Sequence, residues 1–170
     1  MVDPSPVDLP SQRLIRAAKA GERRALALLW EGSVDTLWSI ARVLSDDEGQ
    51  ALLVLASLRQ DLRVHAPGLS TSRPWRTQSV ERLYLLLNSD FEDLEDVLQR
   101  AGPARVPWSP DRPGRLEDLP VELRAVFVFH LLGGLSVAEI AALLGVGEMT
   151  VRGARTWMSY RMVRAEQESS

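Results

Sequence analysis

Basic and hydroxyl side chains that could contact DNA recur at helical spacing towards the C-terminal end of the chain. At about 100° per residue, Arg152, Arg155, Thr156 and Ser159 fall on one side of a helix that begins near Glu148. Arginine binds phosphates and the edge of guanine, and hydroxyl groups form hydrogen bonds with both phosphates and bases. This face predicts contacts with a groove of DNA.

The opposite side of the same helix is apolar and predicts packing against other helices. Its residues are Val151, Ala154, Met158 and Met162. Residues 145–164 include four arginines and a single acid, Glu148, so this segment is basic in a chain whose net charge is -3. An ordinary amphipathic helix with a solvated face would show the same two stripes, and that alternative stays open.

A second, shorter helix is predicted immediately before this one. Ser136 and Glu139 have the spacing of a capping box, in which each side chain accepts a hydrogen bond from the other residue's backbone N–H. Gly145 stands where a helix ends in a left-handed residue, a conformation that glycine adopts without steric strain. The apolar stripe between them consists of Ile140, Ala141 and Leu144. A short capped helix, a glycine turn and a second helix with a polar face are typical of a helix-turn-helix DNA-binding unit.

Composition excludes several other classes of protein. The chain has 170 residues, of which 45% are hydrophobic and 25% charged, enough for one or two globular domains. No apolar run is long enough to cross a membrane, and residues 1–6 lack the basic start and apolar core of a secretory signal. We therefore expect a cytoplasmic protein without membrane insertion.

Residues that could support catalysis or metal binding are scarce. There is no cysteine, and the two histidines, His65 and His130, have no ligand partners at suitable spacing. His65 is predicted to end a helix, and His130 to be a satisfied residue on an apolar helix. No phosphate-binding glycine loop or nucleophile motif is present. We expect no enzymatic activity, no metal, no cofactor and no small-molecule substrate.

Hydrophobic periodicity along the chain is helical throughout and predicts an all-α fold. The predicted helices of the first domain are residues 11–20, 23–44, 48–64, 75–88 and 91–100. Its predicted core comprises Leu14, Ile15, Leu26, Leu29, Trp30, Leu37, Ile40, Ala41, Leu53, Leu55, Leu83 and Leu86. Residues 102–114 contain four prolines and two glycines, a composition that cannot continue a helix. We therefore predict two small helical domains, 1–100 and 119–170, joined by a Pro-rich linker at 101–118.

The chain resembles the sigma-70 family of bacterial transcription initiation factors, in particular its short extracytoplasmic-function (ECF) branch, which has only the second and fourth conserved regions. The region-four resemblance is carried by LPVELRAVF at 119–127, GLS at 134–136, EIA at 139–141, LG at 144–145 and TVR at 150–152. The start of region two is resembled by LIRAAKAGERRA at 14–25 and LWSIAR at 37–42.

This resemblance implies that region two binds core RNA polymerase and melts the minus-ten promoter element, while region four reads the upstream minus-thirty-five element. Core RNA polymerase and promoter DNA are the implied partners, and an anti-sigma factor is a further candidate partner. The implied upstream-element contacts are Thr150, Arg152, Arg155, Thr156 and Ser159.

Region two departs from the family pattern at its polymerase-docking helix. Where the family has acidic and glutamine residues, this chain has the apolar run 52–58. The candidate docking residues are Leu52, Leu55, Ala56 and Arg59. A helix that packs only within its own domain is an equal alternative.

The segment that would melt the minus-ten element has fewer aromatic residues than the family pattern. The remaining candidates are Arg73, Trp75, Arg76 and Arg82, of which only Trp75 could stack on a base. A buried core position is an equal alternative for Trp75. The acidic run at 92–96 would repel a phosphate backbone near it.

Three functional hypotheses follow. The first, which the domain order favours, is a sigma factor that directs polymerase to a small set of promoters. The second is a sigma-like DNA-binding regulator or adaptor that has lost independent promoter opening, and the altered region-two motifs favour it. The third, a helix-turn-helix regulator with an unrelated sensor domain, is disfavoured by the motif at 14–25.

Overall fold

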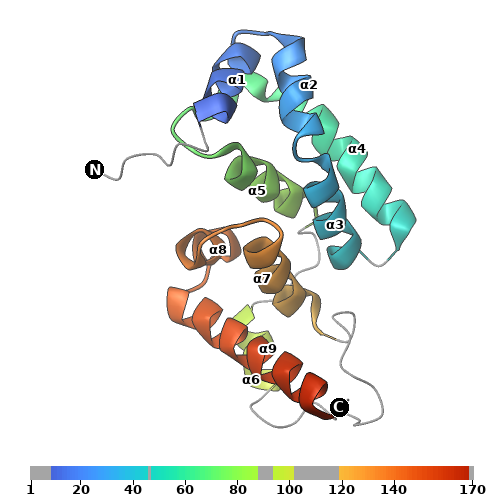
Figure 1. Cartoon of the computed structure of the whole chain (residues 1–170), viewed down its shortest axis with the longest axis vertical. Helices are drawn as coiled ribbons and strands as arrows, with labels where there is room; N and C mark the ends of the chain where they lie inside the picture. Colours follow the sequence, from blue (N-terminus) through green and yellow to red (C-terminus); the bar gives the residue numbers. More distant parts are fainter. Residues whose placement is uncertain (1–8, 46, 88–93, 102–118, 169–170) are drawn as a thin grey trace. The chain divides into compact units, whose positions relative to one another are not determined.

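The computed structural model describes residues 9–45, 47–87, 94–101 and 119–168, with side chains for 11–45, 47–87, 94–100 and 119–158. All regular structure in these residues is helical, which confirms the predicted all-α fold (Figure 1). The chain divides into two compact units, Met1–Ser89 and Asp90–Ser170. None of the described helices is both long and apolar enough to span a membrane.

The first unit is built from helices that bury one apolar stripe each. They are α1 (Leu9–Lys19), α2 (Arg23–Glu31), α3 (Val34–Leu44), α4 (Glu48–Val64) and α5 (Trp75–Leu87), with a short 3₁₀ turn, Ala66–Gly68, after α4. Helix α1 packs on α2, and α4 packs on both α3 and α5. The side chains of Ile15, Leu37, Ile40, Leu58 and Leu83 are fully buried and form the centre of this core.

The predicted single helix 23–44 is interrupted between α2 and α3. The hydroxyl of Ser33 donates hydrogen bonds to the carbonyl oxygens of Leu29, at 2.9 Å, and Trp30, at 3.2 Å. These carbonyls belong to the last turn of α2, where no further backbone donor is available within the helix. The indole Nε1 of Trp75 donates to the same hydroxyl at 3.2 Å, so a contact from α5 helps to hold the break.

Helix α4 has a capped N-terminus and one buried apolar face. The carboxylate of Asp47 accepts a hydrogen bond from the backbone N–H of Gln50 at 2.8 Å, which caps the N-terminus. Its buried residues, Ala51, Leu55, Leu58 and Leu62, follow the spacing of one helix face.

Two residues predicted to lie in the core are instead exposed. Leu53 on α4 is 71% exposed and Leu86 on α5 is 38% exposed. Both lie in runs of consecutive apolar residues, where composition alone does not show which residue faces inwards. The helical period places Leu53 opposite the stripe that contains Leu55.

The second unit contains α6 (Leu94–Ala101), α7 (Val121–Leu131), α8 (Val137–Leu144) and α9 (Glu148–Glu168). Helix α6 packs against α7 and α9, and its buried residues are Leu94 and Val97. The structure therefore places α6 in the second unit, whereas the predicted boundary at residue 100 assigned it to the first domain. The Pro-rich segment 102–118 lies outside the described residues.

Candidate nucleic-acid interface

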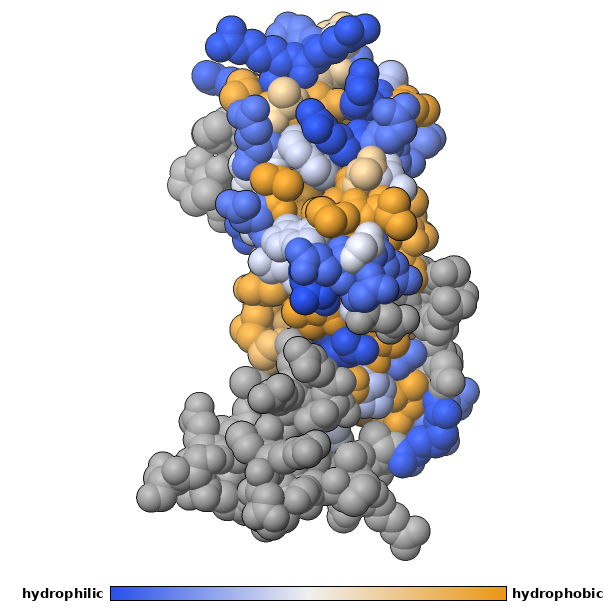
Figure 2. All heavy atoms as spheres, turned by 90° about the vertical axis from the view of Figure 1, so that its right-hand side faces the viewer, coloured by the Kyte–Doolittle hydropathy of each residue, from blue (hydrophilic) through white to orange (hydrophobic). Residues whose placement is uncertain are grey.

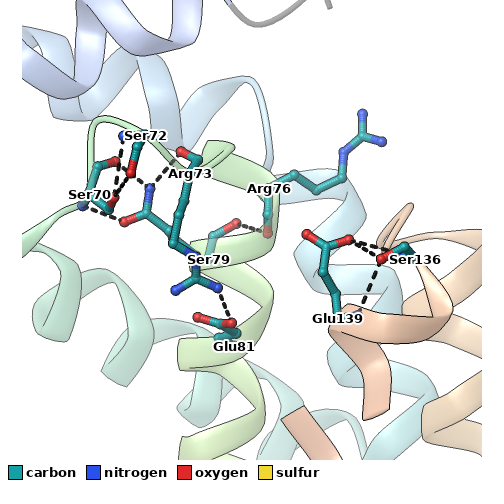
Figure 3. Close-up of polar contacts among 9 residues, drawn as sticks. Ser70, Ser72, Arg73, Arg76, Ser79, Glu81, Ser136 and Glu139 are labelled. Atoms are coloured by element: carbon teal, nitrogen blue, oxygen red, sulfur yellow. Dashed lines mark hydrogen bonds and ion pairs between the residues drawn. The ribbon is translucent and has the colours of Figure 1, made fainter. Parts of the chain in front are cut away.

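The N-terminus of α8 carries the predicted capping box (Figure 3). The Ser136 hydroxyl accepts a hydrogen bond from the backbone N–H of Glu139 at 3.2 Å. Oε2 of Glu139 accepts in return from the backbone N–H and the hydroxyl of Ser136, both at 2.8 Å. This arrangement satisfies backbone donors that the first turn of a helix leaves free. It fixes Ser136 as the N-cap residue of α8.

The turn between α8 and α9 depends on a left-handed glycine. Gly145 has φ 70° and ψ 25°, and the backbone N–H of Val146 donates to the carbonyl of Ala141 at 3.1 Å. A Cβ atom on Gly145 would meet no atom within 4 Å, so the requirement for glycine is conformational rather than spatial. The turn brings the start of α9 close behind the end of α8, as predicted.

The buried face of α9 is confirmed by the structure. Val151 and Ala154 are 0% exposed and Met158 is 3% exposed, and α9 packs on both α7 and α8. The side chain of Met162, predicted to lie on the same stripe, is outside the described residues.

The opposite face of α9 is polar and accessible. Arg152 and Thr156 are exposed, while Thr150 and Arg155 are half-buried. The side chain of Ser159 lies outside the described residues. The structure thus brings four of the five predicted DNA-contact residues to the first two and a half turns of one helix, α9, which we call the recognition helix.

Arg152 is engaged by an acid of its own helix. Its Nη2 lies 3.2 Å from Oε2 of Glu148, one turn earlier, and the two side chains are 59% and 51% exposed. Exposed ion pairs at this spacing contribute only about 0.3–0.5 kcal/mol. Arg152 can therefore exchange this carboxylate for a phosphate with little loss.

Thr150 forms a contact that sequence reasoning missed. Its Oγ1 donates to Oε1 of Glu95 at 3.1 Å, which joins the first turn of the recognition helix to the first turn of α6. The acidic run at 92–96 was noted in the sequence but was placed beside the Trp75 segment. Only the packing of α6 on α9 shows that its described acids, Glu95 and Asp96, belong to the second unit.

The two histidines occupy the predicted structural positions. Nδ1 of His65 lies 2.9 Å from the Asp61 carboxylate and 3.0 Å from the Asp61 carbonyl oxygen, at the C-terminal end of α4. Nδ1 of His130 lies 3.1 Å from the carbonyl oxygen of Leu135. The described residues contain no group of three or more His, Asp or Glu side chains that could hold a metal ion.

The candidate strand-melting residues are largely engaged within the first unit. Trp75 is only 6% exposed and bonds to Ser33, so its ring offers no open face for stacking, and the core alternative holds. Arg73 pairs with Glu81, as Figure 3 shows. Arg82 Nη1 lies 2.7 Å from Oδ2 of Asp61.

Arg76 is exposed and, unlike Arg73 and Arg82, forms no ion pair with another described residue. The loop before it is tied down by Gln78, whose side-chain amide accepts from the Ser70 N–H at 2.7 Å and donates to the carbonyls of Ser70 and Arg73. The side chain of Arg76 points away from this network (Figure 3).

The predicted polymerase-docking residues divide between two faces of α4. Leu52 is 56% exposed, and Ala56 and Arg59 share its face, whereas Leu55 is 8% exposed and belongs to the core. Leu55 thus lies in the core, where it was also predicted, and Leu53 is the exposed apolar residue that was missed. Figure 2 shows apolar side chains reaching the surface on the side of the first unit that carries α4.

Comparison with known proteins agrees with this geometry. The model of the family "Sigma-70, region 4" matches residues 114–155, which span α7, α8 and the exposed start of α9. No curated protein matches the chain. Among solved structures, CnrH in complex with the cytosolic domain of CnrY shares the fold, with a TM-score of 0.60 and 19% sequence identity over 94% of each chain.

The match at residues 114–155 covers the helix-turn-helix whose cap, turn and polar face are described above. The shared fold extends over both units of the chain. Proteins with this domain are DNA-binding regulators of transcription rather than enzymes. Residues 114–155 thus match region 4 of the sigma-70 family, and the chain shares the fold of CnrH.

Proposed function

We propose that this protein is a sigma factor that binds core RNA polymerase in the cytoplasm and directs it to a specific set of promoters. The observation that carries the proposal is the recognition helix. Its apolar face is buried, its polar face is exposed over the first turns, and it lies in the segment that matches region 4. This division is what a helix needs to enter the major groove while it remains packed on its domain.

In this proposal Arg152, Arg155 and Thr156 contact the upstream promoter element, and Ser159 extends the same face. Arginines supply phosphate contacts and bidentate contacts to guanine, while hydroxyl groups supply shorter contacts. Thr150 joins them once its bond to Glu95 is exchanged for a contact with DNA.

The exposed face of α4 is the proposed polymerase-docking surface. It presents Leu52, Leu53, Ala56 and Arg59 to solvent. Two adjacent leucines that are more than half exposed are typical of a surface that another protein covers. The docking would be more apolar than the acidic contact that the family pattern implies.

An anti-sigma factor is a further proposed partner. CnrH, which shares this fold, was solved in complex with the cytosolic domain of CnrY, a protein partner. A domain of comparable role could cover exposed apolar surface of this chain until polymerase competes for it.

A second candidate function is a sigma-like regulator that binds DNA but does not open promoters on its own. The buried ring of Trp75 favours it, together with the ion pairs that occupy Arg73 and Arg82. Capture of unpaired bases requires exposed aromatic and basic groups, and of the four candidates only Arg76 is both exposed and without an acidic partner among the described residues.

The two candidates are separated by mixing the purified protein with bacterial core RNA polymerase and following co-migration on a sizing column at moderate salt. Co-migration supports the sigma factor, and its absence with DNA binding retained supports the regulator. The variant L52E/L53E should abolish co-migration if α4 docks. The matched control is L85E/L86E, which places the same two charges on two exposed leucines of α5 and should still co-migrate.

A further inference from the structure

A groove lies in the first unit, between the end of α1, the start of α2 and the C-terminal end of α4. Its volume is about 450 Å³, within the range of about 300–1,000 Å³ in which proteins bind ligands. The apolar part of its lining includes Ala18, Leu26, Ala27, Trp30, Leu62 and Val64. Val64 is 60% exposed, so this apolar surface reaches solvent.

The rest of the groove lining is predominantly basic. Arg23, Arg59 and Arg63 line it, and all three are exposed, while Glu22 is its one acidic residue. None of these arginines forms an ion pair with another described residue, in contrast to Arg73, Arg82 and Arg152. The groove thus combines an apolar floor with an excess of two positive charges, in a chain whose net charge is -3.

We propose that this groove binds an amphipathic helix of a protein partner, with apolar side chains on the face that enters the groove and Glu or Asp residues beside them. The volume accommodates several side chains but not a whole helix, so the partner helix would lie across the opening. The described part of the first unit offers no strand edge, so a peptide cannot bind here by adding a strand. Insertion of apolar anchors from a helix is the recognition mode that fits a helical surface.

The charge of the lining selects the class of helix. Exposed arginines attract carboxylates and oppose lysine or arginine at the same positions, which gives specificity and speeds association. A nucleic acid would also be attracted, but its backbone would contact only the arginines and would leave Leu26, Trp30 and Val64 uncovered. The apolar floor therefore favours a protein over a nucleic acid.

The groove is distinct from the proposed polymerase-docking face, although Arg59 belongs to both. The inference does not depend on the proposed function, and its test avoids Arg59. The variant R23E/R63E reverses two charges of the groove. The variant R13E/R42E is the matched control, because it makes the same change at two exposed arginines outside the groove.

The experiment measures fluorescence anisotropy of two labelled helical peptides of about four turns, or roughly 15 residues, added to the full chain. Both peptides carry leucine at i, i+4 and i+7, and they differ only in having Glu or Lys at the flanking positions. The Glu peptide should bind at least about tenfold more tightly than the Lys peptide. R23E/R63E should weaken binding of the Glu peptide by about tenfold, so that the Lys peptide binds more tightly than the Glu peptide. R13E/R42E should change the affinity for either peptide by less than about twofold.

Several results would overturn the inference. They are no binding of either peptide, equal binding of both, or an equal loss in the control variant. A labelled single-stranded oligonucleotide that binds more tightly than the Glu peptide, and whose binding is lost in R23E/R63E, would identify a nucleic-acid site instead. Duplex DNA binding through the second unit should be unaffected by R23E/R63E, so failure of this inference and failure of the proposed function are measured separately.

Discussion

Oγ1 of Thr150 donates a 3.1 Å hydrogen bond to Oε1 of Glu95, so an acidic side chain contacts the start of the recognition helix. Asp96 adjoins Glu95 in the first turn of α6. A phosphate that approaches Thr150 would meet these carboxylates, and like charges repel. The contact therefore opposes DNA binding at the residue where the helix would enter the groove.

Neutralising this carboxylate should strengthen DNA binding. In Glu95→Gln the side-chain oxygen still accepts from Thr150, but the negative charge is lost. We expect affinity for duplex DNA to rise by about two- to fivefold at low ionic strength and the gain to shrink as salt is added, because exposed charges are screened. Fluorescence anisotropy at two salt concentrations measures this. Glu31→Gln, at the end of α2 in the first unit, is the matched control, and an equal gain there would contradict the specific role of Glu95.

The arginines of the recognition helix should account for much of its affinity. Replacing both Arg152 and Arg155 by alanine should lower DNA affinity by about tenfold or more and reduce the slope of log K against log salt by about two, since each phosphate contact contributes about 0.9. Alanine is a good helix former, so the circular dichroism signal should not fall. Arg13→Ala with Arg42→Ala removes the same charge from the first unit and should leave the slope unchanged. An unaltered slope in the recognition-helix variant would refute its assignment.

Two glycines of the second unit should respond to alanine in opposite directions. Gly145→Ala forces a Cβ into the left-handed region and should lower the free energy of unfolding by about 1–2 kcal/mol. Gly153 lies within α9, where a Cβ would meet no atom within 4 Å, so Gly153→Ala should raise stability by about 0.5–1 kcal/mol. Urea unfolding followed by circular dichroism gives both values. Equal effects of the two changes would show that the turn does not depend on the backbone conformation of Gly145.

Features with a local physical cause were predictable from the sequence. The capping box needs only Ser136 and Glu139 at the right spacing, and the left-handed turn needs only Gly145 at the end of an apolar stripe. The buried face of the recognition helix follows from a period of three and four residues. These features use interactions within a few residues of the chain.

Features that depend on tertiary contacts were not predictable in the same way. The break at Ser33 is stabilised by Trp75, which is far away in sequence. Leu53 and Leu55 are the same residue type in one apolar run. Only packing against neighbouring helices shows which of the two is buried. The Glu95–Thr150 hydrogen bond could be predicted only by knowing that α6 packs on α9. The Pro-rich sequence that follows α6 has no hydrophobic periodicity that would indicate this packing.

The burial of Trp75 makes a prediction about mechanism as well as stability. Trp75→Ala should lower the free energy of unfolding by about 3–5 kcal/mol, because it leaves a large cavity in the first unit. Trp75→Phe keeps most of the volume and loses the hydrogen bond to Ser33, so a smaller loss of about 1–3 kcal/mol is expected. At a temperature where Trp75→Phe is folded, polymerase-dependent promoter opening by this variant should match that of the unaltered protein.

Arg76→Ala, which removes an exposed cation from the same helix without affecting the core, should reduce promoter opening if this surface contacts the melted strand. A folded Trp75→Phe variant that binds polymerase but fails to open the promoter would instead show that the indole leaves the core to stack on a base.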